Sequence, residues 1–353
     1  MSWSMADPWW PQGRIERYRI SILNQQEALI QTQLDGVSSG VIEWGVDNDI
    51  RAAGNLDLTL TDSNKSIDWA KVRMRIEYIL KWDGVDRVYP LGVYIPSAPK
   101  SDVSPTDETL DLEFYDKTII LKQDKLANTK AFAKGSYITN ALKWVFDSIG
   151  DDKYVIDAST KKFSKNRVYK AGTSKLEIVQ ALLKDLDYFA IWCDGDGYFR
   201  CHTYKLPKDR PVVYEFLEGD RSIHSARWQL DQDGFEVPNR VITIPRTGSK
   251  SGLAEDLTSR WGYAARGRWI TAVESDVDET TTAKLNAKAK TLLAAKQDVH
   301  DKVTISHAFL PVNMNELVRF KSQGHAGTFA FRQMTISLTP TALVQSVLEG
   351  VTV

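Results

Sequence analysis

The five histidines are the residues best suited to bind a metal or to move a proton near neutral pH. They are His202, His224, His300, His307 and His325. Metal-binding histidines usually stand at a short fixed spacing, as in His-Glu-x-x-His, and none of the five has a neighbour at such a spacing. The sequence therefore predicts no metal site.

Carboxylate pairs need separate attention, because a glycosidase requires only two acidic residues. Asp276, Asp278 and Glu279 form one cluster, and Glu255 with Asp256 forms another. Each cluster precedes an expected helix or lies in a loop rich in Gly, Ser and Arg, where acids commonly cap helices or face solvent. We predict no catalytic residue and keep hydrolysis at Asp276 or Asp278 as an alternative.

Local motifs that bind phosphates or activate a serine are also missing. The sequence contains no Gly-x-Ser-x-Gly elbow, P-loop or Gly-x-Gly-x-x-Gly fingerprint. Asp194-x-Asp196-Gly197 begins like a calcium loop, but no glutamate closes it, which favours a plain hairpin turn. No cofactor is expected.

Two cysteines, Cys193 and Cys201, flank that turn. A hairpin turn at Asp196-Gly197 pairs residue 193 with residue 200 and residue 192 with residue 201. This register sends the two sulfurs to opposite faces of the hairpin. We therefore expect two packing thiols and no disulfide.

The turn belongs to a longer stretch, 172–204, that has the pattern of a scaffold. Ser174 and Glu177 form a capping box at the start of a predicted helix. The apolar positions that follow have helical spacing: Leu176, Val179, Leu183 and Leu186. Aromatic runs at 188–192 and 198–200 predict the two strands of a hairpin directly after this helix.

Composition and charge exclude several classes of protein. Apolar residues make up 42% of the chain and charged residues 26%, as in an ordinary globular protein. The net charge of −1 predicts no bulk attraction to nucleic acid. By thirds, residues 1–122 carry −6, residues 123–212 carry +5 and residues 213–353 are neutral. Because the sequence has no signal peptide and no long apolar run, we expect synthesis in the cytoplasm and no stable membrane insertion.

Residues 14–122 are predicted to form a first β-barrel domain. Apolar and polar residues alternate with period two in three segments: 56–61, 71–82 and 110–115. Asp83-Gly84 predicts a hairpin turn. Three prolines are expected to mark strand ends or an edge: Pro90, Pro96 and Pro99. About six strands in all suit a small closed or half-open barrel.

Residues 123–212 are expected to form a small α/β domain with two helices and the hairpin. Ser136 is predicted to cap the first helix, which continues to Ile149 and stops at Gly150. A basic connection at 161–170 precedes the second helix and has few interleaved aromatics, which favours a solvated linker over a nucleic-acid groove.

Residues 213–353 are predicted to form a second β-barrel domain with a helix at about 280–297. Candidate strands are 212–216, 225–230, 239–244, 269–273, 302–309, 316–321, 328–338 and 344–348. The helix carries a thin stripe that suits a barrel edge: Leu285, Ala289, Leu292 and Lys296. The expected fold class is α+β, mainly β, with two antiparallel barrels and a small α/β domain between them.

Residues 1–13 form an arm that holds Trp3, Trp9 and Trp10 beside two prolines. The arm either lies over its own first domain or docks on a neighbouring subunit, and both interpretations remain open. These tryptophans are the candidate partner-docking residues.

The order of domains resembles the hub proteins at the tip of phage tails and of contractile injection machines, including the hub part of type VI secretion spikes. Tyr115-Asp116-Lys117-Thr118-Ile119-Ile120-Leu121 is similar to the family's passage out of the first barrel. Gly172-Thr173-Ser174, its helix and the 194–198 turn resemble the central α/β domain. Pro238-Asn239-Arg240-Val241-Ile242 resembles the strand that starts the second barrel.

The resemblance implies a structural role in the virion, at the phage tail tip, after assembly in the host cytoplasm. Such hubs are trimers in which two similar barrels per chain make a pseudo-sixfold ring between tube and tip, and exposed barrel edges suit pairing between subunits. The implied partners are two further copies, a distal tail or tail-tube protein, the tape-measure protein, and a tip spike, fibre or receptor-binding protein. The hub is expected to close or gate the tail lumen, through which DNA passes during ejection without sequence-specific contacts.

Two other functions stay open. A tail-associated cell-wall hydrolase would use the carboxylates described above. A receptor- or carbohydrate-binding tip protein would use aromatic residues such as Trp261, Tyr263 and Trp269, although Trp269 also suits the core of a strand. The sequence stops soon after the second predicted barrel, so we expect wall-degrading or host-binding activity on another protein. If the charge of −6 faces the lumen, it would help DNA to slide past.

Overall fold

The computed structural model describes residues 15–82, 84–104, 108–219, 222–231, 234–246, 249–277, 279, 281–297 and 301–351. These residues divide into two compact units. The larger unit contains the described residues up to Trp228 and those from Ile305 onward, and the smaller unit is Gln229–Thr304.

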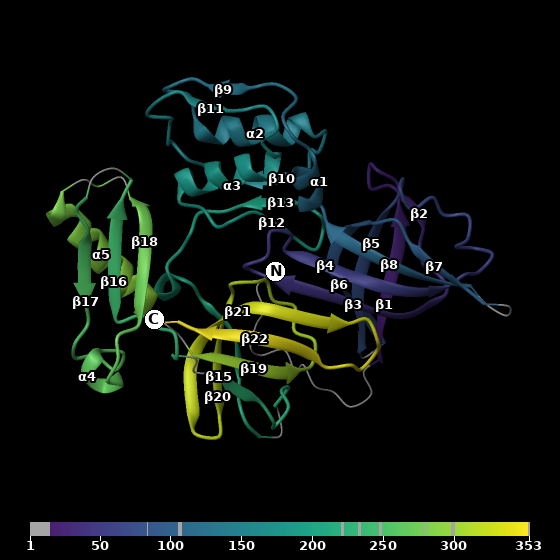
Figure 1. Ribbon diagram of the computed structural model, residues 1–353. Coiled ribbons are helices and arrows are strands. Elements are labelled where there is room, and N and C mark those ends of the chain that lie inside the picture. The colour runs from purple at the N-terminus through teal and green to yellow at the C-terminus, as the bar shows by residue number, and fades with distance from the viewer. Residues whose placement is uncertain are drawn as a thin grey trace. The chain divides into compact units, whose positions relative to one another are not determined.

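The N-terminal part of the larger unit is built from strands β1–β8 (Figure 1). Their bounds are β1 Ile15–Leu23, β2 Leu29–Gln31, β3 Val37–Gly45, β4 Ala52–Thr59, β5 Arg73–Trp82, β6 Val85–Pro96, β7 Lys100–Val103 and β8 Glu108–Asp116. The alternating pattern buries one face of the sheet, where Leu56 and Leu58 of β4 pack with Leu112 and Phe114 of β8 out of reach of water. The period-two prediction is confirmed for β4 and β8, whereas in β5 both faces are buried from Ile76 to Leu80.

Strands β5 and β6 form the predicted hairpin, with Trp82 opposite Val85. Gly84 takes the positive φ of +73° that such a turn requires. Pro90, however, lies inside β6 and does not mark a strand end. The described pairing of β6 with β8 covers Tyr94–Pro96, so at Pro90 the strand pairs with β5 alone and is an edge, the other position predicted for these prolines. The register shifts between Ile76 and Glu77 opposite this position, and such a bulge accommodates a proline that has no N–H to give to the ladder.

The C-terminal part of the larger unit adds a second group of strands. They are β14 Val212–Phe216, β19 Lys302–His307, β20 Leu317–Ser322, β21 His325–Ser337 and β22 Val344–Gly350. Strand β21 also pairs with β3, which places Gln333 opposite Gly45. One sheet therefore runs in the order β15-β19-β22-β21-β3-β4-β8-β6-β5-β1-β2, in which β15 is Gln229–Asp231. The chain is mainly β, as predicted, and over the described residues this order is an open path, not a ring.

The small α/β part lies between these two groups of strands in the sequence. Its elements are α1 Thr118–Gln123, β9 Lys130–Phe132, α2 Ile138–Ser148, β10 Tyr154–Ile156, β11 Arg167–Tyr169, α3 Lys175–Leu186, β12 Trp192–Cys193, β13 Phe199–Cys201 and the 3-10 helix Pro207–Asp209. The capping box of α3 is confirmed, because Ser174 accepts from the N–H of Glu177 and Glu177 accepts from the N–H of Ser174. Ser136 is not a cap. Tyr137 occupies that position, and the Ser136 hydroxyl donates to the carbonyl oxygen of Ala133.

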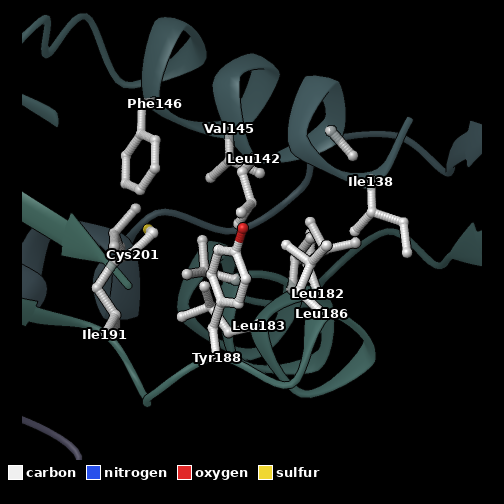
Figure 2. Close-up of a cluster of buried hydrophobic side chains, with 14 of the residues drawn as sticks. Ile138, Leu142, Val145, Phe146, Leu182, Leu183, Leu186, Tyr188, Ile191 and Cys201 are labelled. Carbon is white, nitrogen blue, oxygen red and sulfur yellow. The ribbon is translucent and has the colours of Figure 1, made fainter. Parts of the chain in front are cut away.

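One apolar core holds this part together. Figure 2 shows side chains of α2 and α3 pointing toward one another across it, with Cys201 at one end. Cys193 pairs with Phe199, one residue away from the predicted register, so both cysteines face the same side of the hairpin and not opposite sides. Both are free thiols, Cys201 is buried in the core, and Cys193 packs against it.

The smaller unit has its own sheet and helix. Its elements are β15 Gln229–Asp231, β16 Arg240–Pro245, β17 Gly252–Glu255, α4 Tyr263–Arg266, β18 Thr271–Val277 and α5 Thr282–Gln297. Strand β16 is central, antiparallel to β17 and parallel to β18. Helix α5 confirms the predicted helix at about 280–297. It lies over one face of this small sheet (Figure 1), where Ala289 and Leu293 pack on Val241. The barrel-edge position is therefore wrong, and Leu293 is buried in place of Leu292.

Candidate functional site

Within the described ranges, no three His, Cys, Asp or Glu side chains come together in a way that could hold a metal ion. Trp3, Trp9, Trp10, His300 and Asp278 lie outside the described residues. No helix within those ranges has the length and apolar character that crossing a bilayer requires.

Two histidines meet in the core of the larger unit, although nothing in their sequence spacing indicated it. His224 and His307 are buried and lie opposite each other in an isolated β-bridge. Nδ1 of His307 lies 2.6 Å from the carbonyl oxygen of Ala308, and Nε2 lies 2.8 Å from Oγ of Ser346. Burial lowers the pKa of His307 to about 4, so this ring is neutral at physiological pH. It is a satisfied core residue, and no described carboxylate orients it as a base.

The acidic pair Glu255 and Asp256 serves structure. Glu255 forms an ion pair with Arg240, its neighbour across the sheet, at 2.7 Å. Asp256 accepts hydrogen bonds from the N–H groups of Thr258 and Ser259, both at 3.1 Å, and from the hydroxyl of Ser259. The hydroxyl bond from Ser259 is the main reason that the pKa of Asp256 lies below its usual value. Glu255 thus stabilises the pairing of two strands, and Asp256 stabilises the loop that follows.

Two of the three aromatic residues considered for receptor binding, Tyr263 and Trp269, pack together in the smaller unit. The rings of Tyr263 and Trp269 are 4.7 Å apart, and the guanidinium of Arg240 lies 3.8 Å from the centroid of the Trp269 ring. Arg260 and Arg266 lie over the ring of Trp261 at 4.5 and 4.7 Å. Arginine side chains therefore lie over the rings of both tryptophans.

The strongest electrostatic feature is an ion network where the first group of strands meets the small α/β part. Lys117 directly follows β8, and its side chain has no exposed surface. Its Nζ lies 2.8 Å from Oε1 of Glu27 and 2.6 Å from Oδ2 of Asp151, and it donates to the carbonyl oxygen of Gly197 at 3.0 Å. Three acceptors match the three protons of the ammonium group, which is what allows a charge to remain buried there.

Two further cations complete this network. Nη1 of Arg73 lies 2.7 Å from Oε1 of Glu27, and Nζ of Lys153 lies 2.6 Å from Oε2 of the same carboxylate. Burial opposes the ionisation of Glu27, but the hydrogen bonds from Lys117 and Lys153 outweigh it and hold its pKa below the usual value. Glu27 is therefore charged at neutral pH and anchors three cations.

The network is a joint between distant segments. Glu27 lies in the turn after β1, Lys117 follows β8, and Asp151 follows α2. The β12–β13 turn packs just as closely, because a Cβ atom at Gly195 would lie only 2.1 Å from the carbonyl oxygen of Pro90. Sequence reasoning did not identify this joint, since nothing local to Lys117 shows which carboxylates meet it. The arrangement fixes geometry and performs no chemistry.

Comparison with known proteins identifies the fold of this chain. No family model and no curated protein matches the sequence. A tail protein from Neisseria meningitidis MC58 matches with a TM-score of 0.63 at 13% identity, over 95% of this chain and 96% of that chain. The 43 kDa tail protein of prophage MuSo2 from Shewanella oneidensis matches with a TM-score of 0.64 at 12% identity, over 95% and 98% of the two chains.

A chain of the Francisella PdpA-VgrG complex is similar as well, with a TM-score of 0.61 at 9% identity, over 96% of this chain and 53% of that one. The likeness to the two tail proteins extends over nearly the full length of both partners. At such low identity, it establishes the fold. The chain therefore has the fold of phage tail proteins, as its resemblance to the hub family predicted.

Proposed function

We propose that this chain is a structural component of a tail tip or baseplate hub and that it is not an enzyme. The observation that carries the proposal is the match, over 95% of the chain, to two phage tail proteins with TM-scores above 0.6. The buried joint at Lys117 supports it, because a scaffold that transmits load needs its parts fixed against one another.

In this proposal three copies assemble, and the two groups of strands in each chain occupy equivalent positions in a pseudo-sixfold ring of barrels. Strand edges supply the contacts between subunits. Strand β2 ends the path of the large sheet, and its Leu29 and Ile30 are 60% and 61% exposed. An exposed apolar edge of this kind is suited to pairing with a strand of another chain, which would bury it.

The ring would join a tail-tube or distal tail protein to the tip and surround the path of the DNA, with the tape-measure protein in the lumen and a spike, fibre or receptor-binding protein below. The place of action is then the virion. No sequence-specific contact with nucleic acid is needed for this role, because DNA only has to pass through.

Solution mass tests the proposal first. Light scattering over a wide concentration range should detect a species of about 120 kDa, three times the chain mass of 39.9 kDa. A dimer or a larger open series of masses would contradict threefold closure. Addition of the cognate tail-tube protein to the same sample should yield a stable complex.

The alternatives are separated by simple assays. A cell-wall hydrolase should clear a peptidoglycan zymogram, and replacement of Asp276 and Asp278 by Asn should abolish that activity. A carbohydrate-binding tip should bind host cells through Trp261, Tyr263 and Trp269. The arginine side chains over Trp261 and Trp269 argue against sugar stacking, which needs an uncovered aromatic face.

A further inference from the structure

The smaller unit carries a cationic and aromatic surface, which we call the arginine platform and define as Arg240, Arg260, Trp261, Arg266, Arg268 and Trp269. From Leu257 to Val273 the sequence contains three arginines and no acidic residue. Four of the six platform residues are cations, and each lies over an aromatic ring. Trp, Tyr and Arg are the residues most enriched where proteins bind one another.

The platform is held rigid from below. Asn239 is fully buried, donates to the carbonyl oxygen of Arg268 at 3.0 Å, and accepts from the N–H of Ile270 at 2.8 Å. Arg266 donates to the carbonyl oxygens of Val237, at 3.0 Å, and Gly234. A surface that is already ordered loses little conformational entropy when it binds a partner.

An uncovered apolar row continues the platform on the same face of the sheet. Arg240 and Ile242 face the same way along β16, opposite the face that α5 covers. Ile242 stands between Leu253 of β17 and Val273 of β18, which are 48% and 56% exposed. Aliphatic residues in a row beside arginines indicate contact with protein and not with a free sugar or nucleotide.

A complementary surface lies on the larger unit. We call it the acidic face and define it as Glu43, Asp57, Asp111 and Glu113, on β3, β4 and β8. These residues alternate with the buried Leu56, Leu58 and Leu112, so they lie on the solvent side of the sheet.

Two carboxylates of the acidic face repel each other. Asp57 and Asp111 stand directly opposite each other in the antiparallel pair β4–β8. Like charges in such a pair destabilise a sheet, and a cationic partner removes that cost. Lys100 lies opposite Asp111 on the other side and offsets one of the four negative charges, which leaves the face acidic overall.

We propose that the arginine platform of one copy docks on the acidic face of a second copy. This inference rests on the proposed function, because it adds to the strand-edge contacts a second contact that would build the oligomer. The two surfaces differ, so the contact is heterologous, and a repeated heterologous contact closes into a ring when the rotation between copies allows it. Guanidinium groups recognise carboxylates through paired hydrogen bonds, which gives the contact its register.

The test uses charge reversal on the full chain. Arg260→Glu with Arg268→Glu reverses the platform, and Asp57→Lys with Glu113→Lys reverses the acidic face. Each pair alone should weaken self-association by roughly a hundredfold or more, measured by light scattering and sedimentation. All four changes in one chain should restore association, because the charges are again complementary.

A matched control makes the same change of charge on the opposite side of the smaller unit. Lys284→Glu with Lys288→Glu changes two exposed lysines of α5 and should leave association unchanged. Far-UV circular dichroism and a denaturation curve establish that every variant is folded before its mass is compared.

The outcomes separate this inference from the proposed function. Trimers that survive both reversals overturn the docking and leave the hub role intact, with the acidic face free to line a lumen. Loss of association without rescue in the fourfold variant overturns the pairing of these two surfaces. A wild-type chain that is monomeric at every concentration overturns self-docking together with self-assembly.

Discussion

Nζ of Lys117 lies 2.6 Å from Oδ2 of Asp151, and the two side chains are 0% and 6% exposed. Lys117 directly follows β8, whereas Asp151 follows α2, so this ion pair joins two parts of the chain that are built from different elements. In so dry a site an ion pair is stable only when its remaining protons and lone pairs are also satisfied. Glu27 and the carbonyl oxygen of Gly197 satisfy the rest of the ammonium group.

Replacement of Lys117 by Met should strongly destabilise the larger unit. The methionine fills a similar volume, but it leaves Glu27 and Asp151 as carboxylates without their central cation. Removal of one partner from a buried ion network typically costs about 3 to 5 kcal/mol of the free energy of unfolding. Urea denaturation followed by tryptophan fluorescence measures the loss.

The control for that change is Lys122→Met. Lys122 forms an ion pair with Asp49 at 3.3 Å, and their side chains are 48% and 68% exposed. An exposed pair contributes at most about 1 kcal/mol, so this variant should unfold nearly as the wild type does. Equal loss in the two variants would contradict a special role for the buried network.

Local patterns predicted those features that depend on neighbouring residues. The alternation along β4 and β8 marked the buried face of these strands correctly, because period two is a property of any strand. The Ser174 and Glu177 capping box was also predictable, since both partners lie within one helical turn.

Features that depend on tertiary pairing were not predictable. The joint between Lys117 and Glu27 brings together residues that are far apart in sequence, and no local pattern records such a contact. The pairing of β21 with β3, which links the two groups of strands into one sheet, is equally non-local. The predicted register of Cys193 was wrong because the loop between the paired strand residues is one residue shorter than expected. A shift of one residue in register moves a side chain to the opposite face of the hairpin.

The caps of α3 and α2 offer a paired test of local stability. Ser174→Ala removes a side-chain acceptor from the N–H of Glu177 and should lower the free energy of unfolding by about 1 kcal/mol. Ser136→Ala should cost less, because Tyr137 and not Ser136 occupies the cap position of α2. Denaturation curves of the two variants give the two changes in the free energy of unfolding. A larger decrease for Ser136→Ala would contradict the assignment of Tyr137 as the cap of α2.

Acid should destabilise the chain through His307. Its pKa is about 4 in the folded protein, against an ordinary value of 6.5 for an exposed imidazole. Above about pH 7 neither state binds the proton, so stability is at its maximum with respect to this group. As the pH falls, His307 binds a proton in the unfolded chain but stays neutral in the folded chain. The free energy of unfolding therefore decreases by about 3 kcal/mol by about pH 4.

His307→Gln isolates this contribution, because glutamine can still hydrogen-bond to Ser346 and cannot titrate. The variant is expected to lose less stability than the wild type between about pH 7.5 and about pH 4, even if it is less stable at neutral pH. His325→Gln is the matched control, since it makes the same substitution at an exposed position. The measurement is the difference in free energy of unfolding between the two pH values for each of the three proteins. If His307→Gln keeps the full wild-type slope, the acid sensitivity does not come from His307.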